Sequence, residues 1–146
     1  MTTVSKILAA KGGQIWSVTP STRLYEALKL MADKDIGALL VFDDDDDTKI
    51  AGIISERDYA RKVILEGKNS MIVPISEIMT ERVLCISPGT TLEECMALMT
   101  DKHIRHLPVM EEEDLVGIIS IGDVVKELIS EQKFVIDQLE NYIRGF

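Results

Sequence analysis

A tandem repeat is the feature that most constrains the fold of this 146-residue chain. The stretch Val18–Phe42 aligns without gaps with Ile86–Met110, and 11 of the 25 aligned positions are identical. After a shift of three residues the block GIIS also recurs, at Gly52–Ser55 and at Gly117–Ser120. A chain that repeats itself in this way builds one supersecondary unit more than once. The fold must therefore accommodate two copies of the same small unit.

Each copy predicts the same order of elements: a short strand, a helix, two apolar strands and a second helix. In the first copy Leu24, Ala27, Leu28 and Met31 recur at the spacing of one helical face. The acidic run at residues 43–47 falls between the two apolar strands and is typical of a hairpin tip. A single unit of this size buries little surface and would have only a small margin of stability alone. We therefore predict an α/β fold of two tandem β-α-β-β-α units packed through their sheets, with an extended C-terminal helix.

The repeat also sets the predicted boundaries. The first unit covers residues 1–66, a linker covers residues 67–75, and the second unit covers residues 76–130. Residues 131–146 have no counterpart in the first copy and continue the last helix. A coiled-coil-like stripe follows this helix through Val125, Leu128, Gln132, Val135, Leu139 and Tyr142. The stripe favours self-association into a homodimer, and packing on its own domain is the alternative.

The balance of charged residues limits the kinds of partner. The chain has 16 basic and 25 acidic residues and a net charge of −9, which does not suit a nucleic-acid duplex or an anionic membrane. No apolar run approaches the roughly 18 residues of a membrane span, and the first residues lack the pattern of a secretion signal. Cys85 and Cys95 fit no CxxC motif and are interpreted as reduced thiols, so we expect a cytoplasmic protein.

The GIIS block ends at a junction between a strand and a helix. Ser55 and Asp58 have the spacing of a capping box, in which each side chain hydrogen-bonds a backbone N–H at the helix start. The second copy repeats this Ser-x-x-Asp spacing. Thr90 and Glu93 predict another capping box, at the start of the second copy's first helix. From these residues alone, the Ser-x-x-Asp pairs can be helix caps, parts of a binding site, or both.

Several motifs, each present twice and in the same order, resemble those of a CBS-domain pair, also called a Bateman module. They are the P-x-x-x-L-x-E stretch that opens the first helix, the strand motifs I-x-A-L-L-V and IRHLPV, and GIISxxD. The tail EQKFVIDQLENYI resembles that of small stand-alone CBS-pair proteins of bacteria and plant mitochondria. The resemblance implies a regulatory module that binds an adenosine-containing ligand, foremost AMP, with NAD or NADH, ATP and S-adenosylmethionine as alternatives. Such a module would act in trans on a partner protein.

The resemblance also implies roles for the residues at both junctions. In CBS domains the Ser or Thr at this position contacts the nucleotide, and the Asp three residues later holds the ribose hydroxyls. A carboxylate can accept both hydroxyls of a cis-diol, and a helix N-terminus attracts phosphate. Arg57 and Arg61 can bind phosphate oxygens, whereas the second copy has Gly122 and Lys126 there and should be a weaker or different site. The junction residues are Ser55, Asp58, Ser120 and Asp123.

The segment IRHLPV adds a second group of expected contacts. In related modules, basic residues before the Leu-Pro-Val strand reach nucleotide phosphates, sometimes across the domain interface. This assigns Arg105 and His106 to the nucleotide held by Asp58. The first copy has Gly37 and Ala38 at these positions, which would leave room for an adenine. The remaining expected contacts, to base and sugar, are Ser17, Thr19, Ile86, Ser87 and Pro108.

Two other classes of function compete with ligand sensing. A ligand-free dimeric scaffold would use the Ser-x-x-Asp pairs only as caps. An enzyme is disfavoured because the sequence suggests no Ser-His-Asp arrangement and contains no GxxxxGK phosphate loop. No metal site is predicted, because the two histidines lack a ligand set and the acidic run lacks the spacing of a calcium loop.

Overall fold

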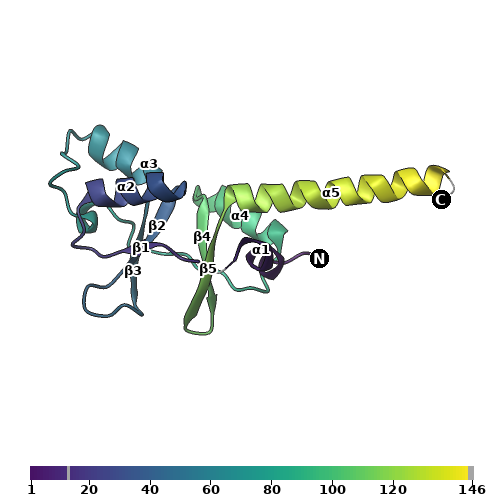
Figure 1. The fold of residues 1–146 in the computed structure, drawn as a ribbon, viewed down its shortest axis with the longest axis horizontal. Coiled ribbons are helices and arrows are strands. Elements are labelled where there is room, and N and C mark those ends of the chain that lie inside the picture. The colour runs from purple at the N-terminus through teal and green to yellow at the C-terminus, as the bar shows by residue number, and fades with distance from the viewer. Residues whose placement is uncertain (13, 145–146) are drawn as a thin grey trace. The chain divides into compact units, whose positions relative to one another are not determined.

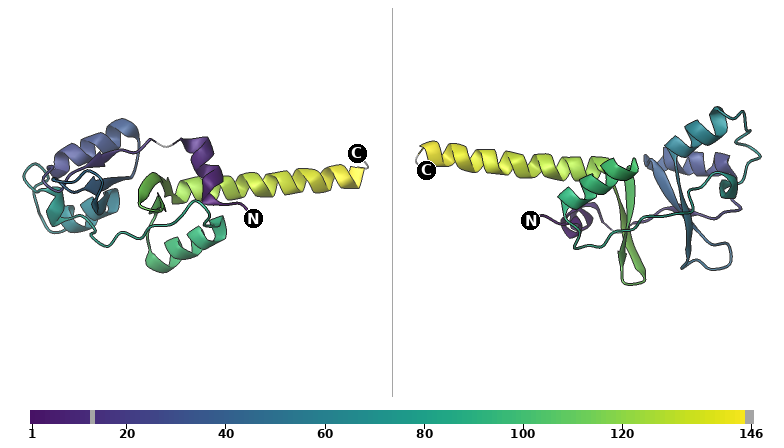
Figure 2. Two further views of the ribbon diagram at one scale, coloured as in Figure 1. Left: turned by 90° about the horizontal axis from the view of Figure 1, so that it is seen from below. Right: turned by 180° about the vertical axis from the view of Figure 1, so that it is seen from behind.

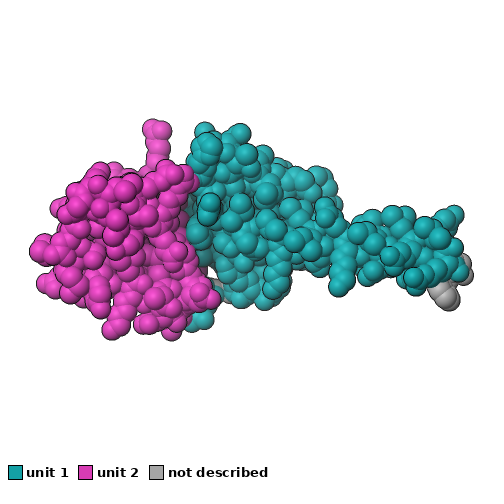
Figure 3. Space-filling view, turned by 90° about the horizontal axis from the view of Figure 1, so that it is seen from above, with its two compact units in different colours: residues 1–14, 84–146 teal, residues 15–83 magenta. Residues whose placement is uncertain are grey.

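The computed structural model describes residues 1–12 and 14–144. The chain forms two compact units, which Figure 3 distinguishes by colour. The first-copy unit is Ile15–Val83, and the second-copy unit is Met1–Gln14 together with Leu84–Phe146. Each has its own buried cluster of mainly aliphatic side chains. The boundaries of these units differ from the predicted ones. The predicted linker, residues 67–75, lies within the first-copy unit.

The first-copy unit is built on a three-stranded sheet in the order β1-β2-β3 (Figure 1). β1 runs parallel to β2, and β2 runs antiparallel to β3. The predicted helical face is present, since Leu24, Ala27 and Met31 are buried against the sheet's apolar residues. The elements are β1 (Ser17–Val18), α2 (Leu24–Lys34), β2 (Ala38–Phe42), β3 (Ile50–Ser55), α3 (Glu56–Tyr59), the π-helix η1 (Ala60–Ile64) and the 3-10 helix η2 (Ile75–Glu77).

The second-copy unit has a two-stranded antiparallel sheet of β4 and β5. The expected first strand is reduced to a single bridge between Ile86 and Val109. The Ile86 N–H donates to Pro108 O at 3.0 Å, and the Met110 N–H donates to Ile86 O at 2.7 Å. The elements are α1 (Val4–Lys11), α4 (Leu92–Lys102), β4 (His106–Glu111), β5 (Asp114–Ser120) and α5 (Ile121–Arg144).

The predicted cap of α4 is displaced by one residue. Thr91, not Thr90, is the N-cap, and its hydroxyl accepts a hydrogen bond from the Glu94 N–H at 3.1 Å. The Thr90 hydroxyl instead accepts from the Ser87 N–H at 3.2 Å. Thr90 therefore closes the turn before the helix, which leaves its neighbour to begin α4.

The segment upstream of each copy completes the core of the other copy. Val4 and Ile7 of α1 are buried in the core of the second-copy unit, and the Val4 N–H donates to Thr90 O at 2.9 Å. Ile75 and Ile78, from the segment before the second copy, are buried in the core of the first-copy unit. The two similar stretches SKIL and SEIM are thus exchanged between the copies.

The predicted fold class is confirmed: the chain has a mixed α/β fold with small sheets and a long C-terminal helix. Helix α5 extends well past the other elements of its unit in every view (Figures 1 and 2). Among the described residues, no helix combines the length and apolar character needed to cross a membrane.

Candidate functional site

In the first-copy unit, the junction between β3 and α3 is a capping box. The Ser55 hydroxyl accepts a hydrogen bond from the Asp58 N–H at 3.3 Å. Asp58 Oδ2 in turn accepts from the Ser55 N–H at 3.0 Å and from its hydroxyl at 3.1 Å. The predicted cap is confirmed, and it fixes the Asp58 carboxylate at the helix start with only 14% of its side chain exposed.

Strand β2 brings further predicted residues to this junction. Ala38 is the cross-strand partner of Ser55, and the Glu56 N–H donates to Gly37 O at 3.1 Å. Gly37 and Ala38 therefore lie beside the junction of Ser55 and Asp58. The strand thus begins beside the junction at two small residues.

The second-copy unit repeats the arrangement with different residues. Asp123 Oδ2 accepts from the Ser120 N–H at 2.8 Å, and the Ser120 hydroxyl accepts from the Asp123 N–H at 3.1 Å. His106 is the cross-strand partner of Ser120, and the Ile121 N–H donates to Arg105 O at 2.8 Å. Arg105 and His106 thus occupy the places that Gly37 and Ala38 take in the first copy.

Each carboxylate also meets a lysine that the sequence analysis did not single out. In the first-copy unit, Lys62 Nζ lies 3.1 Å from Asp58 Oδ1 and donates to Ile78 O at 3.0 Å. Lys62 follows Asp58 by four residues, so the i, i+4 spacing could have identified it. The Thr80 hydroxyl is also within 3.5 Å of Asp58 Oδ1.

In the second-copy unit the lysine comes from the other end of the chain. Lys11, the last residue of α1, lies with its Nζ 2.7 Å from Asp123 Oδ2 and donates to Ile118 O at 3.0 Å. No local spacing could have identified Lys11, because 112 residues separate it from Asp123. The exchange of α1 between the copies brings it there.

These contacts shift two pKa values in the second-copy unit. Burial lowers the pKa of His106 below its usual value, and the positive charges of Lys11 and Arg105 lower it further, against the opposing effect of Asp123. For Asp123, burial acts to raise the pKa, but hydrogen bonds from Lys11 and Ser120 outweigh it, so the net pKa lies below the usual value. The junction therefore favours an ionised carboxylate and a neutral imidazole near pH 7.

The other predicted site residues divide between exposed and structural positions. Arg57 and Arg61 are exposed on α3 and η1. Ile86 and Pro108 are buried, so they contribute packing to the core of their unit. The other three lie on or after the first strands: Ser17 pairs with Leu40, the Thr19 and Thr22 hydroxyls are 3.0 Å apart, and the Ser87 N–H donates to Thr90.

The predicted residues are divided between the two units. Arg57 and Arg61 belong to the first-copy unit with Asp58, whereas Arg105 and His106 belong to the second-copy unit with Asp123. The assignment of Arg105 and His106 to the ligand of Asp58 stays a prediction. Within residues 1–12 and 14–144, no group of three or more His, Cys, Asp or Glu side chains is arranged to hold a metal ion.

Comparison with known proteins identifies the repeated unit. The CBS domain family model matches residues 12–65 and 75–130. A CBS domain-containing mitochondrial protein of Arabidopsis thaliana, CBSX3, is 38% identical over 151 aligned residues, which cover 99% of this chain and 73% of that protein.

Two solved structures extend the comparison. A CBS-domain protein from Burkholderia ambifaria, described as a signal-transduction protein, is 51% identical with a TM-score of 0.84, and the match covers 90% of this chain and 96% of that one. The CBS domain pair of protein MJ0100, solved in complex with 5′-methylthioadenosine and S-adenosylmethionine, is 25% identical with a TM-score of 0.74, over 87% and 99% of the two chains. With both repeats matched and both junctions in place, this chain belongs to the CBS-domain family as a tandem pair.

Proposed function

We propose that this chain is a regulatory module that binds an adenosine-containing ligand at its strand-to-helix junctions. The observation that carries the proposal is a partly buried aspartate at the helix start in both copies, Asp58 and Asp123. The complex of the MJ0100 domain pair with two adenosine compounds supports the same class of ligand. Ligand binding would change the arrangement of domains or protomers, and a partner protein would respond to that change.

The carboxylate of Asp58 is suited to the two hydroxyls of a ribose. Its Oδ2 serves the cap, whereas Oδ1 accepts from Lys62 and lies near the Thr80 hydroxyl. An arriving cis-diol would replace the two donors at Oδ1 and leave the cap at Ser55 intact. The displaced Lys62 ammonium would then be available to a phosphate on the same ligand.

AMP is the first candidate ligand for the first-copy junction. Arg57 and Arg61 add exposed guanidinium groups on α3 and η1, and guanidinium groups pair with phosphate oxygens in a bidentate fashion. The second-copy junction has Gly122 in place of Arg57, and the cation paired with its carboxylate is Lys11. We expect it to bind a different adenosine compound or to bind AMP more weakly. NAD, NADH, ATP and S-adenosylmethionine are the other candidates.

The test is a series of thermal melts with AMP, ADP, ATP, NAD⁺, NADH and S-adenosylmethionine. A ligand at 100 times its dissociation constant should stabilise the protein by ~2.7 kcal/mol. We expect AMP to raise the Tm of the wild-type protein, and Asp58→Asn to abolish that rise. Asparagine can still accept from the Ser55 N–H, so the cap should largely survive. Glu56→Gln, an exposed neighbour in the same turn, is the matched control and should keep the ligand effect.

One alternative function has support from the same contacts. Both Ser-x-x-Asp pairs are complete capping boxes, which is all that a ligand-free scaffold would require of them. If no adenosine compound raises the Tm, the scaffold function replaces the proposal. The variant Asp123→Asn shows which junction binds the ligand. A ligand of the first-copy junction should still raise the Tm of this variant, whereas a ligand of the second-copy junction should not.

A further inference from the structure

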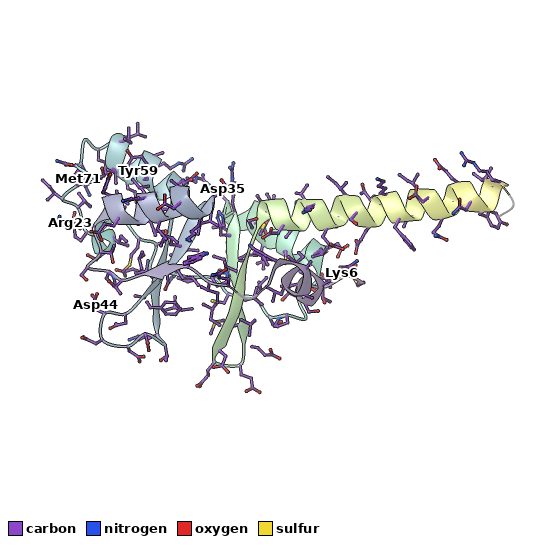
Figure 4. The ribbon with its side chains drawn as sticks, viewed as in Figure 1. Lys6, Arg23, Asp35, Asp44, Tyr59 and Met71 are labelled. Atoms are coloured by element: carbon purple, nitrogen blue, oxygen red, sulfur yellow. The ribbon has the colours of Figure 1, made fainter. Side chains whose placement is uncertain are left out.

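The second half of α5 lies outside the folded part of its unit. Val124 is fully buried and Leu128 packs against the core, but every residue from Gln132 to Arg144 is exposed. Lys6 of α1 (Figure 4) pairs with Glu127 at 2.8 Å, near the point where α5 departs from the unit. Figures 1 and 2 show the rest of α5 as a straight helix that no other element of this unit accompanies.

This exposed half carries an apolar face. At 100° per residue, its large side chains at spacings of three, four and seven fall on one side of the helix. We call the set the α5 apolar face: Ile129, Val135, Ile136, Leu139, Tyr142 and Ile143, exposed by 59%, 54%, 54%, 57%, 83% and 82%. Phe134 is 64% exposed but points to the opposite side of α5. Gln132 lies within the face.

A helix of this kind requires a partner. Isolated segments of this length are marginally helical in water, because helix nucleation is costly and most helical stability comes from tertiary packing. The six side chains together expose on the order of 800 Å², comparable to the area that each partner buries in a standard interface. Exposed apolar patches of that size mark interaction sites.

We propose that the α5 apolar face binds the same face of a second copy of this chain, with the two helices antiparallel and centred on Ile136. In this register, residues equally distant from Ile136 face each other, so Ile136 meets its own equivalent. Ile129 meets Ile143 at the outer ends. Gln132 lies nearly level with Leu139 of the second copy, since these two residues are four and three positions from Ile136.

Charge complementarity selects the second copy and the antiparallel direction. Lys133 and Glu140 lie seven residues apart on the same flank of the face. Antiparallel pairing about Ile136 places Lys133 opposite Glu140 of the second copy, and symmetry creates this pair twice. Parallel pairing would instead place each side chain level with its own equivalent and would stack the two Gln132 side chains.

The first experiment locates the interface. Sedimentation equilibrium of the full chain should show a dimer, and Ile136→Asp should convert it to a monomer. Phe134→Asp is the matched control, because it introduces the same charge at a side chain of similar exposure on the opposite side of α5. It should remain dimeric. Circular dichroism of both variants checks that the rest of the protein is folded.

The second experiment tests the direction of pairing. Lys133→Glu and Glu140→Lys should each weaken dimerisation by roughly tenfold, because each replaces two attractive pairs by two repulsive ones. The double variant should restore the wild-type dissociation constant, since the pairs are reversed but complementary. Failure of the double variant to restore dimerisation would overturn the antiparallel register.

Three results would overturn the proposal as a whole: a monomeric wild-type protein, an Ile136→Asp variant that remains dimeric, or equal dissociation of both aspartate variants. None of these results depends on the proposed ligand. The thermal melts test the junctions, whose residues are not part of the α5 apolar face, so failure of one proposal can be told from failure of the other.

Discussion

Asp58 and Asp123 hold equivalent places in the repeat, yet their surroundings differ in chemistry. Asp58 pairs with Lys62 of the same helical segment, whereas Asp123 pairs with Lys11 from the N-terminal helix. A local pair persists as long as its helix does, but the Lys11 pair also requires α1 to remain docked. The predicted difference between the copies came from Arg57 against Gly122 and from the residues before the two strands, and the two lysines add to it.

The electrostatic effect of Lys11 can be measured at His106. We expect Lys11→Met to raise the pKa of His106, because the variant removes a positive charge that lowers it and leaves Asp123 to favour the imidazolium. The chain has only two histidines, so proton NMR titration can follow each one. Lys6→Met removes a cation from the same helix that pairs with Glu127 instead, and it should leave His106 unchanged. An unchanged pKa in Lys11→Met would contradict the contact.

His106 should also make stability depend on pH. Its pKa is lowered in the folded protein by burial and by neighbouring cations, whereas in the unfolded chain it should be near 6.5. Between these two values the unfolded state binds more protons, so the free energy of unfolding rises with pH. The contribution is complete above about 6.5 and is lost as the pH falls through the folded pKa. Urea titrations should show a weaker dependence in His106→Gln than in His103→Gln over this window.

Among the elements, those defined by local spacing could be predicted from the sequence. The face of α2 follows from the recurrence of Leu24, Ala27 and Met31, and the junction cap follows from Ser55 and Asp58. The cap of α4 was misassigned because two adjacent threonines compete for it, and only the turn bond of Thr90 decides between them.

The exchange of the upstream segments could not be predicted from local spacing. The stretches SKIL and SEIM have the same apolar pattern, so either could pack on either copy. Long-range packing decides between them, with Ile7 buried in one core and Ile78 in the other. The contact between Lys11 and Asp123 was missed for the same reason, because it exists only when α1 docks on the second copy.

The exchange explains the glycine in each GIIS block. A Cβ at Gly52 would lie 2.7 Å from the Thr80 backbone O, and a Cβ at Gly117 would lie 2.5 Å from Leu8 Cδ2. Both glycines allow an exchanged segment to approach the strand closely. The neighbours of the two glycines differ in rigidity. The Thr80 carbonyl near Gly52 is part of the backbone and is fixed, whereas the end of the Leu8 side chain near Gly117 can rotate.

We therefore expect Gly52→Ala to lower the free energy of unfolding by about 1–3 kcal/mol and Gly117→Ala to lower it by less. Gly89→Ala is the control and should be nearly neutral, because its Cβ would meet nothing closer than the Ser87 hydroxyl at 4.0 Å. Urea unfolding followed by circular dichroism measures all three. An equal loss in the two strand variants would contradict the distinction between a rigid and a yielding neighbour.

For the molecule as a whole, the repeats recognised in sequence are not the units that fold. The family repeats span residues 12–65 and 75–130, whereas the packed units are Ile15–Val83 and a discontinuous unit that needs α1. Consequently the second-copy junction is assembled from both ends of the chain. Its lysine, Lys11, precedes the first repeat, so the ion pair of Asp123 requires the docking of α1.

The difference between the sequence repeats and the packed units predicts which fragments of the chain fold. A fragment of residues 15–83 keeps the complete core of its unit, and we expect it to unfold cooperatively in urea. A fragment of residues 12–65 lacks Val73, Ile75 and Ile78, which are 8%, 0% and 1% exposed in the protein. Removing one large buried aliphatic side chain typically costs about 2–5 kcal/mol, and a small domain has only about 5–15 kcal/mol in total. The shorter fragment should therefore show no cooperative transition by circular dichroism. Equal urea midpoints for the two fragments would mean that the exchanged segment contributes nothing to the core. In that case the stability of the first-copy unit would have to come from its sheet and α2 alone.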